Sequence, residues 1–175
     1  MTVVRREVLS LAPAADDPEV GRWLSALDEA RGRTLHELDG VVDGELGERP
    51  GGADNSIETL LYHVALIEAD WLYADILGID DPPSAVRRLL PIDDRDLEGR
   101  LSEVGAMPLD DHLDRLASVR RLVHEHLRPM GVEDFHRPRA RPDHDVSPAW
   151  VLHHLLQHEA EHRAQIAWVR DHLRS

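Results

Sequence analysis

Two histidines near the end of the chain have the spacing of a metal-binding pair. Residues 158–166 read HEAEHRAQI, so His158, Glu159 and His162 match the H-E-x-x-H pattern that holds zinc in many proteases. Two imidazoles four residues apart lie on one face of a helix, roughly 6 Å from each other, and can bind a single ion. The chain has 12 histidines, and at that frequency about one such pair arises by chance, so the spacing alone is weak evidence.

The position of the pair on its helix is more informative. His158 and His162 stand between Leu155 and Ile166 on one apolar helical stripe, which predicts that both rings face the interior. Buried imidazoles are costly unless their nitrogens are paired. The pair is therefore expected to bind a metal ion or, alternatively, to hydrogen-bond in the core with a carboxylate such as that of Glu68. We favour the metal.

A zinc protease is not expected. A catalytic zinc normally has three protein ligands and one open position. Where proteases place a third histidine six residues after the motif, this chain has Trp168, and no glutamate follows His162. The third ligand must come from elsewhere, and we expect it at His63. This residue stands in SIETLLYHVALIEADWL, at the edge of the apolar face of an earlier helix.

Two further residues are candidates for catalysis beside the metal ligands. His154 precedes His158 by one helical turn, where it would act as an acid or base in a pocket or else lie half-exposed between helices. Glu159, inside the motif, is the second candidate and would act as a base, although not for peptide hydrolysis. We therefore predict His154 and Glu159 as the catalytic residues.

The elements that must position these residues are helices. The sequence predicts an all-α fold, a four-helix bundle with long crossover loops, as a single domain over residues 1–175. Apolar periodicity and start signals such as Asp17-Pro18 and Ser147-Pro148 place the helices at about 18–39, 56–77, 109–128 and 148–173. One or two short helices are expected in the crossover, near 84–90 and 94–104, and no strand is expected.

Composition limits the classes of function. The formal charge of −14 disfavours binding to nucleic acid or to an anionic membrane, and the basic run RPRAR at 137–141 is expected to be a solvated loop. No apolar run approaches the roughly 20 residues that span a bilayer. The apolar stretch of the N-terminal RREVLSLAPAADD is too short for a signal peptide, so we expect a cytoplasmic protein. The chain has no cysteine, so any metal must be bound by His, Asp or Glu.

Two stretches of the chain, SIETLLYHVALIEADWL and SPAWVLHHLLQHEAEHRAQI, resemble the DinB/YfiT-like family of metalloenzymes. The resemblance extends over about residues 18–173. Three histidines match the metal ligands of that family: His63, His158 and His162. The R-G-Q-I tail of the family is matched at Arg163, Gln165 and Ile166, with Ala164 in place of the usual glycine.

The resemblance implies a fold, a cofactor and a chemistry. It implies a four-helix bundle, often a homodimer, in which three histidines and water hold a divalent ion, most often zinc or nickel. Related members are mycothiol-dependent maleylpyruvate isomerase and S-transferases that use bacillithiol or mycothiol. All 20 basic residues here are arginine, which indicates a GC-rich genome of actinobacterial type and hence mycothiol as the thiol.

The leading functional hypothesis is a metal-dependent S-transferase acting on small molecules. A cation favours the thiolate form of a bound thiol, and since the chain has no cysteine the thiol would be a low-molecular-weight cofactor. The first alternative is a hydrolase that uses metal-activated water, with Glu159 or His154 as the base. The second is a stress-related bundle that binds a metal without catalysis.

Overall fold

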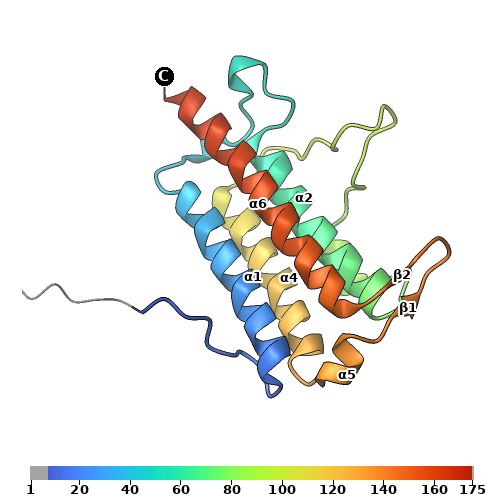
Figure 1. The fold of residues 1–175 in the computed structure, drawn as a ribbon. Helices are drawn as coiled ribbons and strands as arrows, with labels where there is room; N and C mark the ends of the chain where they lie inside the picture. Colours follow the sequence, from blue (N-terminus) through green and yellow to red (C-terminus); the bar gives the residue numbers. More distant parts are fainter. Residues whose placement is uncertain (1–7, 175) are drawn as a thin grey trace, which may run out of the picture.

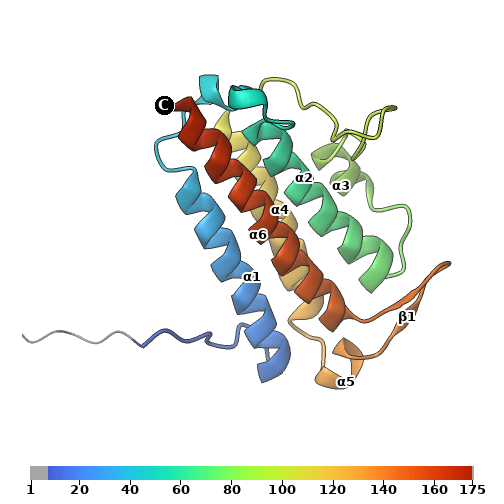
Figure 2. The ribbon, with the colours of Figure 1, turned by 45° about the horizontal axis from the view of Figure 1, so that its top comes forward.

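Four long helices lie side by side in the computed structural model, which describes residues 8–174 (Figure 1). They are α1 (Pro18–Glu37), α2 (Ile57–Asp70), α4 (Leu109–Leu127) and α6 (Pro148–Leu173). Helices α1 and α6 run in one direction and α2 and α4 in the other (Figures 1 and 2). Helix α6 packs against both α1 and α2, and α2 also packs against α4. The expected all-α fold class is confirmed.

Three of the four long helices begin at a residue whose side chain caps them. The Asp17 carboxylate accepts hydrogen bonds from the first turn of α1, and Ser56 and Ser147 do the same for α2 and α6. Pro18 and Pro148 occupy the first helical turn, where the missing N–H costs nothing. These caps fix the register in which α2 and α6 present their histidines.

The end of α2 departs from a regular α-helix. Its last turns form a wider π-helical segment, η3 (Trp71–Ile76), in which the Leu77 N–H donates to the Leu72 carbonyl five residues back. A continuous helix was expected over 56–77. Such π-helical turns are rare and occur frequently at functional sites, and this one begins at an aromatic residue that lines the pocket described below.

The crossover between α2 and α4 contains one short helix, α3 (Ser84–Leu89). The prediction of a second short helix near 94–104 is wrong, because this stretch is a loop closed by a β-bridge between Arg95 and Leu101. The Asp96 carboxylate accepts the backbone N–H groups of Glu98 and Arg100, so the side chain holds a turn in place of a helix. This loop contacts α2 through Asp94, whose carboxylate lies 2.6 Å from a ring nitrogen of His63.

Short elements complete the chain. They are η1 (Asp43–Glu45), η2 (Pro50–Gly52), α5 (Val132–Phe135) and a two-stranded antiparallel hairpin that was not expected, β1 (Arg139–Ala140) with β2 (Asp145–Val146). The basic run at 137–141 is paired with acids: Arg139 lies 3.0 Å from Asp134, and Arg141 lies 2.6 Å from Asp80. No helix among residues 8–174 is both long enough and apolar enough to cross a membrane.

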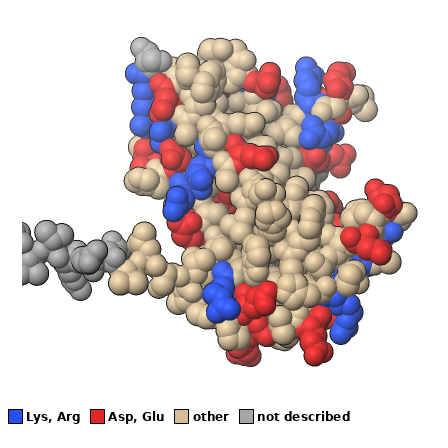
Figure 3. All heavy atoms as spheres, in the orientation of Figure 1, with Lys and Arg blue, Asp and Glu red and all other residues tan. Residues whose placement is uncertain are grey.

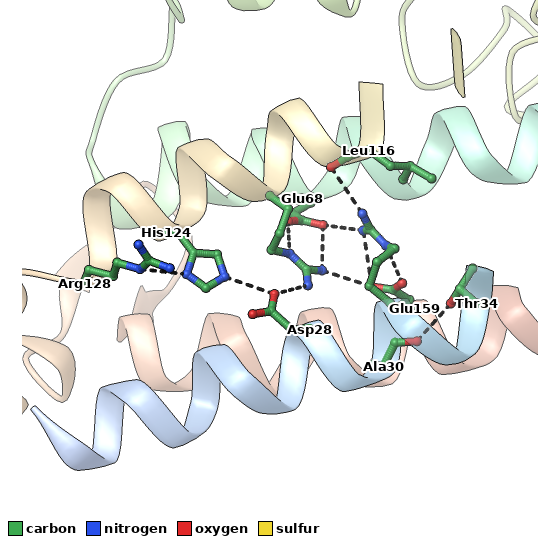
Figure 4. Close-up of polar contacts among 10 residues, drawn as sticks. Asp28, Ala30, Thr34, Glu68, Leu116, His124, Arg128 and Glu159 are labelled. Carbon is green, nitrogen blue, oxygen red and sulfur yellow. Dashed lines mark hydrogen bonds and ion pairs between the residues drawn. The ribbon is translucent and has the colours of Figure 1, made fainter. Parts of the chain in front are cut away.

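A buried group of four charges links all four long helices (Figure 4). Each helix contributes one member: Arg31 from α1, Glu68 from α2, Arg120 from α4 and Glu159 from α6. Each guanidinium bonds to both carboxylates, at 2.6 and 2.7 Å for Arg31 and at 2.6 and 3.2 Å for Arg120. Neither arginine is more than 7% exposed and neither glutamate more than 2%. We call this group the four-charge cluster.

Candidate metal centre

Three histidines from two helices meet at one point. His63 of α2 lies opposite the pair of α6, His158 and His162, because the two helices pack together in opposite directions. The Nε2 atom of His158 lies 3.0 Å from that of His63 and 3.1 Å from that of His162. One ring nitrogen of each histidine lies within 4.8 Å of those of the other two, which is a spacing that can hold a metal ion.

The hydrogen bonds of the outer ring nitrogens direct lone pairs toward the centre. The Nδ1 atom of His63 donates to the Asp94 carboxylate at 2.6 Å, and that of His162 donates to the Gln165 amide oxygen at 3.0 Å. Both Nε2 atoms therefore present lone pairs to His158, whose single ring proton can satisfy only one of them. A cation among the three nitrogens resolves this conflict, so the residues fit a metal.

The two distances from His158 agree with this interpretation. Zinc–nitrogen bonds of about 2.0–2.1 Å place two ligands of one ion about 2.8–3.4 Å apart, for octahedral to tetrahedral angles. Burial, followed by the neighbouring His162 and His63, lowers the pKa of His158 to about 3. Burial also lowers the pKa of His63, although Asp94 acts in the opposite direction. Neutral imidazole is the form that binds a metal.

Two features of the centre differ from what the sequence suggested. His63 was expected at the edge of an apolar face, but only 6% of it is exposed because the crossover loop covers it. Asp94 in that loop was not anticipated, since the stretch around it was expected to be helical. An acidic residue in an Asp-rich loop gives no spacing signal that would connect it with a histidine 31 positions earlier.

The three histidines line a pocket of about 410 Å³ between α2 and α6. His154, one of the two predicted catalytic residues, lies in the same pocket, with its ring centroid 6.0 Å from that of His158. Its ring packs against Trp71 and Trp150, and no hydrogen bond of its nitrogens is found within residues 8–174. This position suits the predicted acid or base role, which stays a prediction.

Glu159, the other predicted catalytic residue, points away from the pocket. Its carboxylate accepts from Arg31 at 2.6 Å and from Arg120 at 3.2 Å, within the four-charge cluster (Figure 4). It is not among the described residues that line the pocket. A buried carboxylate whose oxygens are occupied by two guanidiniums has no access to substrate, so the placement argues against the predicted role and for an ion-pairing one.

Glu68 also differs from its expected role. It was the suggested carboxylate partner of the core histidines in the alternative without a metal, but it bonds to Arg31 and Arg120 instead. The histidines are thus left with Asp94 and Gln165 on their outer sides.

A larger cavity, of about 690 Å³, lies between α1 and α4. Arg31, Arg120 and Leu116 are part of its lining, and none of the three clustered histidines is. Arg31 already bonds to two carboxylates and Arg120 to three, so this cavity offers no unpaired charge of the four-charge cluster. The three clustered histidines line the smaller pocket.

Comparison with known proteins supports the fold and the family. A crystal structure described as the conserved protein of locus from Enterococcus faecalis superposes with a TM-score of 0.67 at 18% sequence identity, covering 86% of this chain and 94% of that one. At this identity the similarity concerns the fold alone. No curated protein matches the chain. The model of the DinB superfamily matches residues 26–166, a span that includes all three clustered histidines, and the chain therefore belongs to the DinB superfamily.

Proposed function

We propose that this protein is a metal-dependent S-transferase that joins a low-molecular-weight thiol to an electrophile. The observation that carries the proposal is the convergence of three imidazole nitrogens, at 3.0 and 3.1 Å, in the wall of an open pocket. Membership of the DinB superfamily and the three-histidine group fit a metal-binding protein. The choice of zinc or nickel as the metal, and of mycothiol as the thiol, is part of the proposal.

The residues around the pocket would have different roles in the proposed reaction. His63, His158 and His162 would hold the ion, while Asp94 and Gln165 keep two of the rings in orientation. A divalent cation bound there supplies Lewis acidity that favours thiolate over thiol. The sulfur must come from a co-substrate, because the chain contains no cysteine.

His154 is the proposed proton acceptor. Its ring faces the pocket with no hydrogen bond among the described residues, so it is open to a substrate. In the reaction the thiol S–H bond breaks and its proton passes to His154. A sulfur–carbon bond forms, and the leaving group departs from that carbon with its electron pair.

The direct test measures thiol transfer with and without metal. Protein freed of metal by a chelator is reloaded with Zn²⁺ or Ni²⁺ and incubated with cysteine, glutathione or mycothiol and with 1-chloro-2,4-dinitrobenzene. Chloride release should depend on metal and on the thiol and should vanish in His162→Ala. His153→Ala, an exposed histidine on the same helix, is the matched control and should retain the activity. Equal rates in the intact protein and His162→Ala with every thiol would contradict the proposal.

Metal-dependent hydrolysis is the second candidate. The open pocket and the unbonded His154 nitrogens would equally serve to take a proton from water. Turnover of an activated ester by metal-loaded protein without any thiol, lost in His162→Ala, would favour this candidate over thiol transfer. A bundle that only binds metal would give neither reaction.

A further inference from the structure

The pocket of the three histidines has two chemically different ends. Along α2, His63, Ile67 and Trp71 line it at intervals of four residues, and α6 faces them with histidines at the same intervals. We call this pocket the trench. The metal-ligating groups lie toward one end of it and the aromatic side chains toward the other. Trp71 follows His63 by eight positions, which corresponds to about 12 Å along the helix axis.

The aromatic end is formed by Trp71, Trp150 and His154. Trp150 and His154 stack with an interplanar angle of 8° and a centroid distance of 5.2 Å. Trp71 is inclined to both rings, at 4.6 Å from His154 and 5.4 Å from Trp150. Trp150 is nevertheless 48% exposed, so part of its ring surface is accessible to a ligand.

A second cavity continues from the aromatic end. It has a volume of about 510 Å³, and Trp71 and Trp150 line it together with Pro138 and Val146. Trp71 lines both cavities, so the trench from the histidines leads onto this surface. Asp145 but no arginine lines the second cavity, and the middle of the face over the N-terminal half of α6 is free of charged side chains in Figure 3. A neutral group is therefore favoured there over an anionic one.

The opposite end is polar. Asn55 and Gln165 line the pocket there, the latter beside His162. Gln165 uses its amide oxygen for His162, which leaves its NH₂ group available to donate. The Asn55 side chain makes no hydrogen bond within the described residues. Polar groups without partners beside a pocket can bind the polar part of a ligand.

We propose that Trp71, Trp150 and His154 form the binding surface for a planar, uncharged part of the electrophile, and that Asn55 and Gln165 face the polar body of the thiol. This inference rests on the proposed function and adds the substrate class. The electrophile would carry an aromatic or otherwise planar group within about 12 Å of its reacting atom, the distance over which the trench runs. Stacking on indole rings and apolar burial supply the selectivity.

Binding can be tested without turnover. 1,3-Dinitrobenzene is planar and has no leaving group, so its affinity is measured by ligand-observed NMR titration of the full-length protein. Trp150→Ala should weaken this binding about five- to tenfold, and Trp150→Phe should restore most of it. Trp168→Ala, which removes another half-exposed tryptophan of α6 outside the trench, should change it less than twofold. Equal affinity of Trp150→Ala and the intact protein, or no binding to the intact protein, overturns the proposal.

The same titration separates this proposal from the transferase proposal. Binding to His162→Ala should persist, since the aromatic surface does not include the metal ligands. If the dinitrobenzene binds at Trp150 but no thiol is transferred, the surface stands and the transferase proposal fails. A second comparison uses the Michaelis constants of two electrophiles, the planar chlorodinitrobenzene and the small, non-aromatic iodoacetamide. If thiol is transferred but Trp150→Ala raises both constants by the same factor, the surface proposal fails.

Discussion

The carboxylate of Asp94 lies 2.6 Å from Nδ1 of His63, so a residue of the crossover loop orients a histidine of helix α2. Hydrogen bonds of this kind hold the tautomer and the direction of a metal-binding imidazole. The loop is therefore part of the candidate metal centre because it orients one of the histidines, and this contact can be tested.

Asp94→Asn should lower the affinity for Zn²⁺ by about 10- to 100-fold, because the amide no longer fixes the Nδ1 proton of His63 as a carboxylate does. Competition with a chelating dye measures the change. Asp93→Asn, an exposed neighbour in the same loop, is the control and should bind as tightly as the intact protein. Unchanged affinity in Asp94→Asn would show that the loop only covers the site.

His63→Ala and His162→Ala should each reduce bound metal far below one ion per chain, since each removes one of three converging nitrogens. Elemental analysis of protein purified without a histidine tag provides the measurement. His153→Ala should keep the full metal content. Undiminished zinc affinity in His63→Ala would mean that the third ligand is another residue.

Glu159→Gln should destabilise the fold by about 3 kcal/mol, because Arg31 and Arg120 would remain buried with one carboxylate fewer. Urea unfolding monitored by circular dichroism measures this change. Glu161→Gln, an exposed acid on the same helix, should have little effect. The folded, metal-loaded Glu159→Gln protein should retain thiol transfer; a stable but inactive variant would instead support the base role first expected for Glu159.

Glu68 should make stability dependent on pH in the acid range. Burial alone would raise its pKa, but the charges of Arg120 and Arg31 outweigh burial and hold the pKa below the ordinary 4.5. The stabilisation is therefore complete above pH 4.5 and is lost as the pH falls through the lower pKa of the folded state. Urea midpoints from pH 7 to 3 should fall more steeply below 4.5 for the intact protein than for Glu68→Gln. Parallel curves would contradict this assignment.

Local signals predicted the fold better than they predicted the polar interior. Asp17-Pro18 and Ser147-Pro148 mark helix starts because capping and the fixed φ of proline act within one turn. The apolar stripe around His158 likewise predicted the side on which the pair lies. The hydrogen bond of Asp94 depends on a loop whose path is set by tertiary packing, and its neighbour Asp96 forms a turn where a helix was expected.

The ion-pair partners of Glu159 were not predicted for the same reason. Glu159 follows His158 directly and precedes His162 by three positions, and the motif suggested a shared role. Its partners in space, Arg31 and Arg120, are 128 and 39 positions away, and no local periodicity connects them. Consecutive residues of a helix point in directions about 100° apart, so adjacency in a motif does not imply a shared site.

The four-charge cluster also opposes a shift of α6 along its axis. A slip of α6 by one turn, about 5.4 Å along its axis, would separate Glu159 from both arginines and, in the same movement, carry His158 and His162 past His63. A shifted alignment of the helices would thus be destabilised by buried charges that have lost their partners, whether or not a metal is bound. We therefore expect the chain to reach its ligand geometry before the ion arrives, so that loading with metal is a binding event uncoupled from folding.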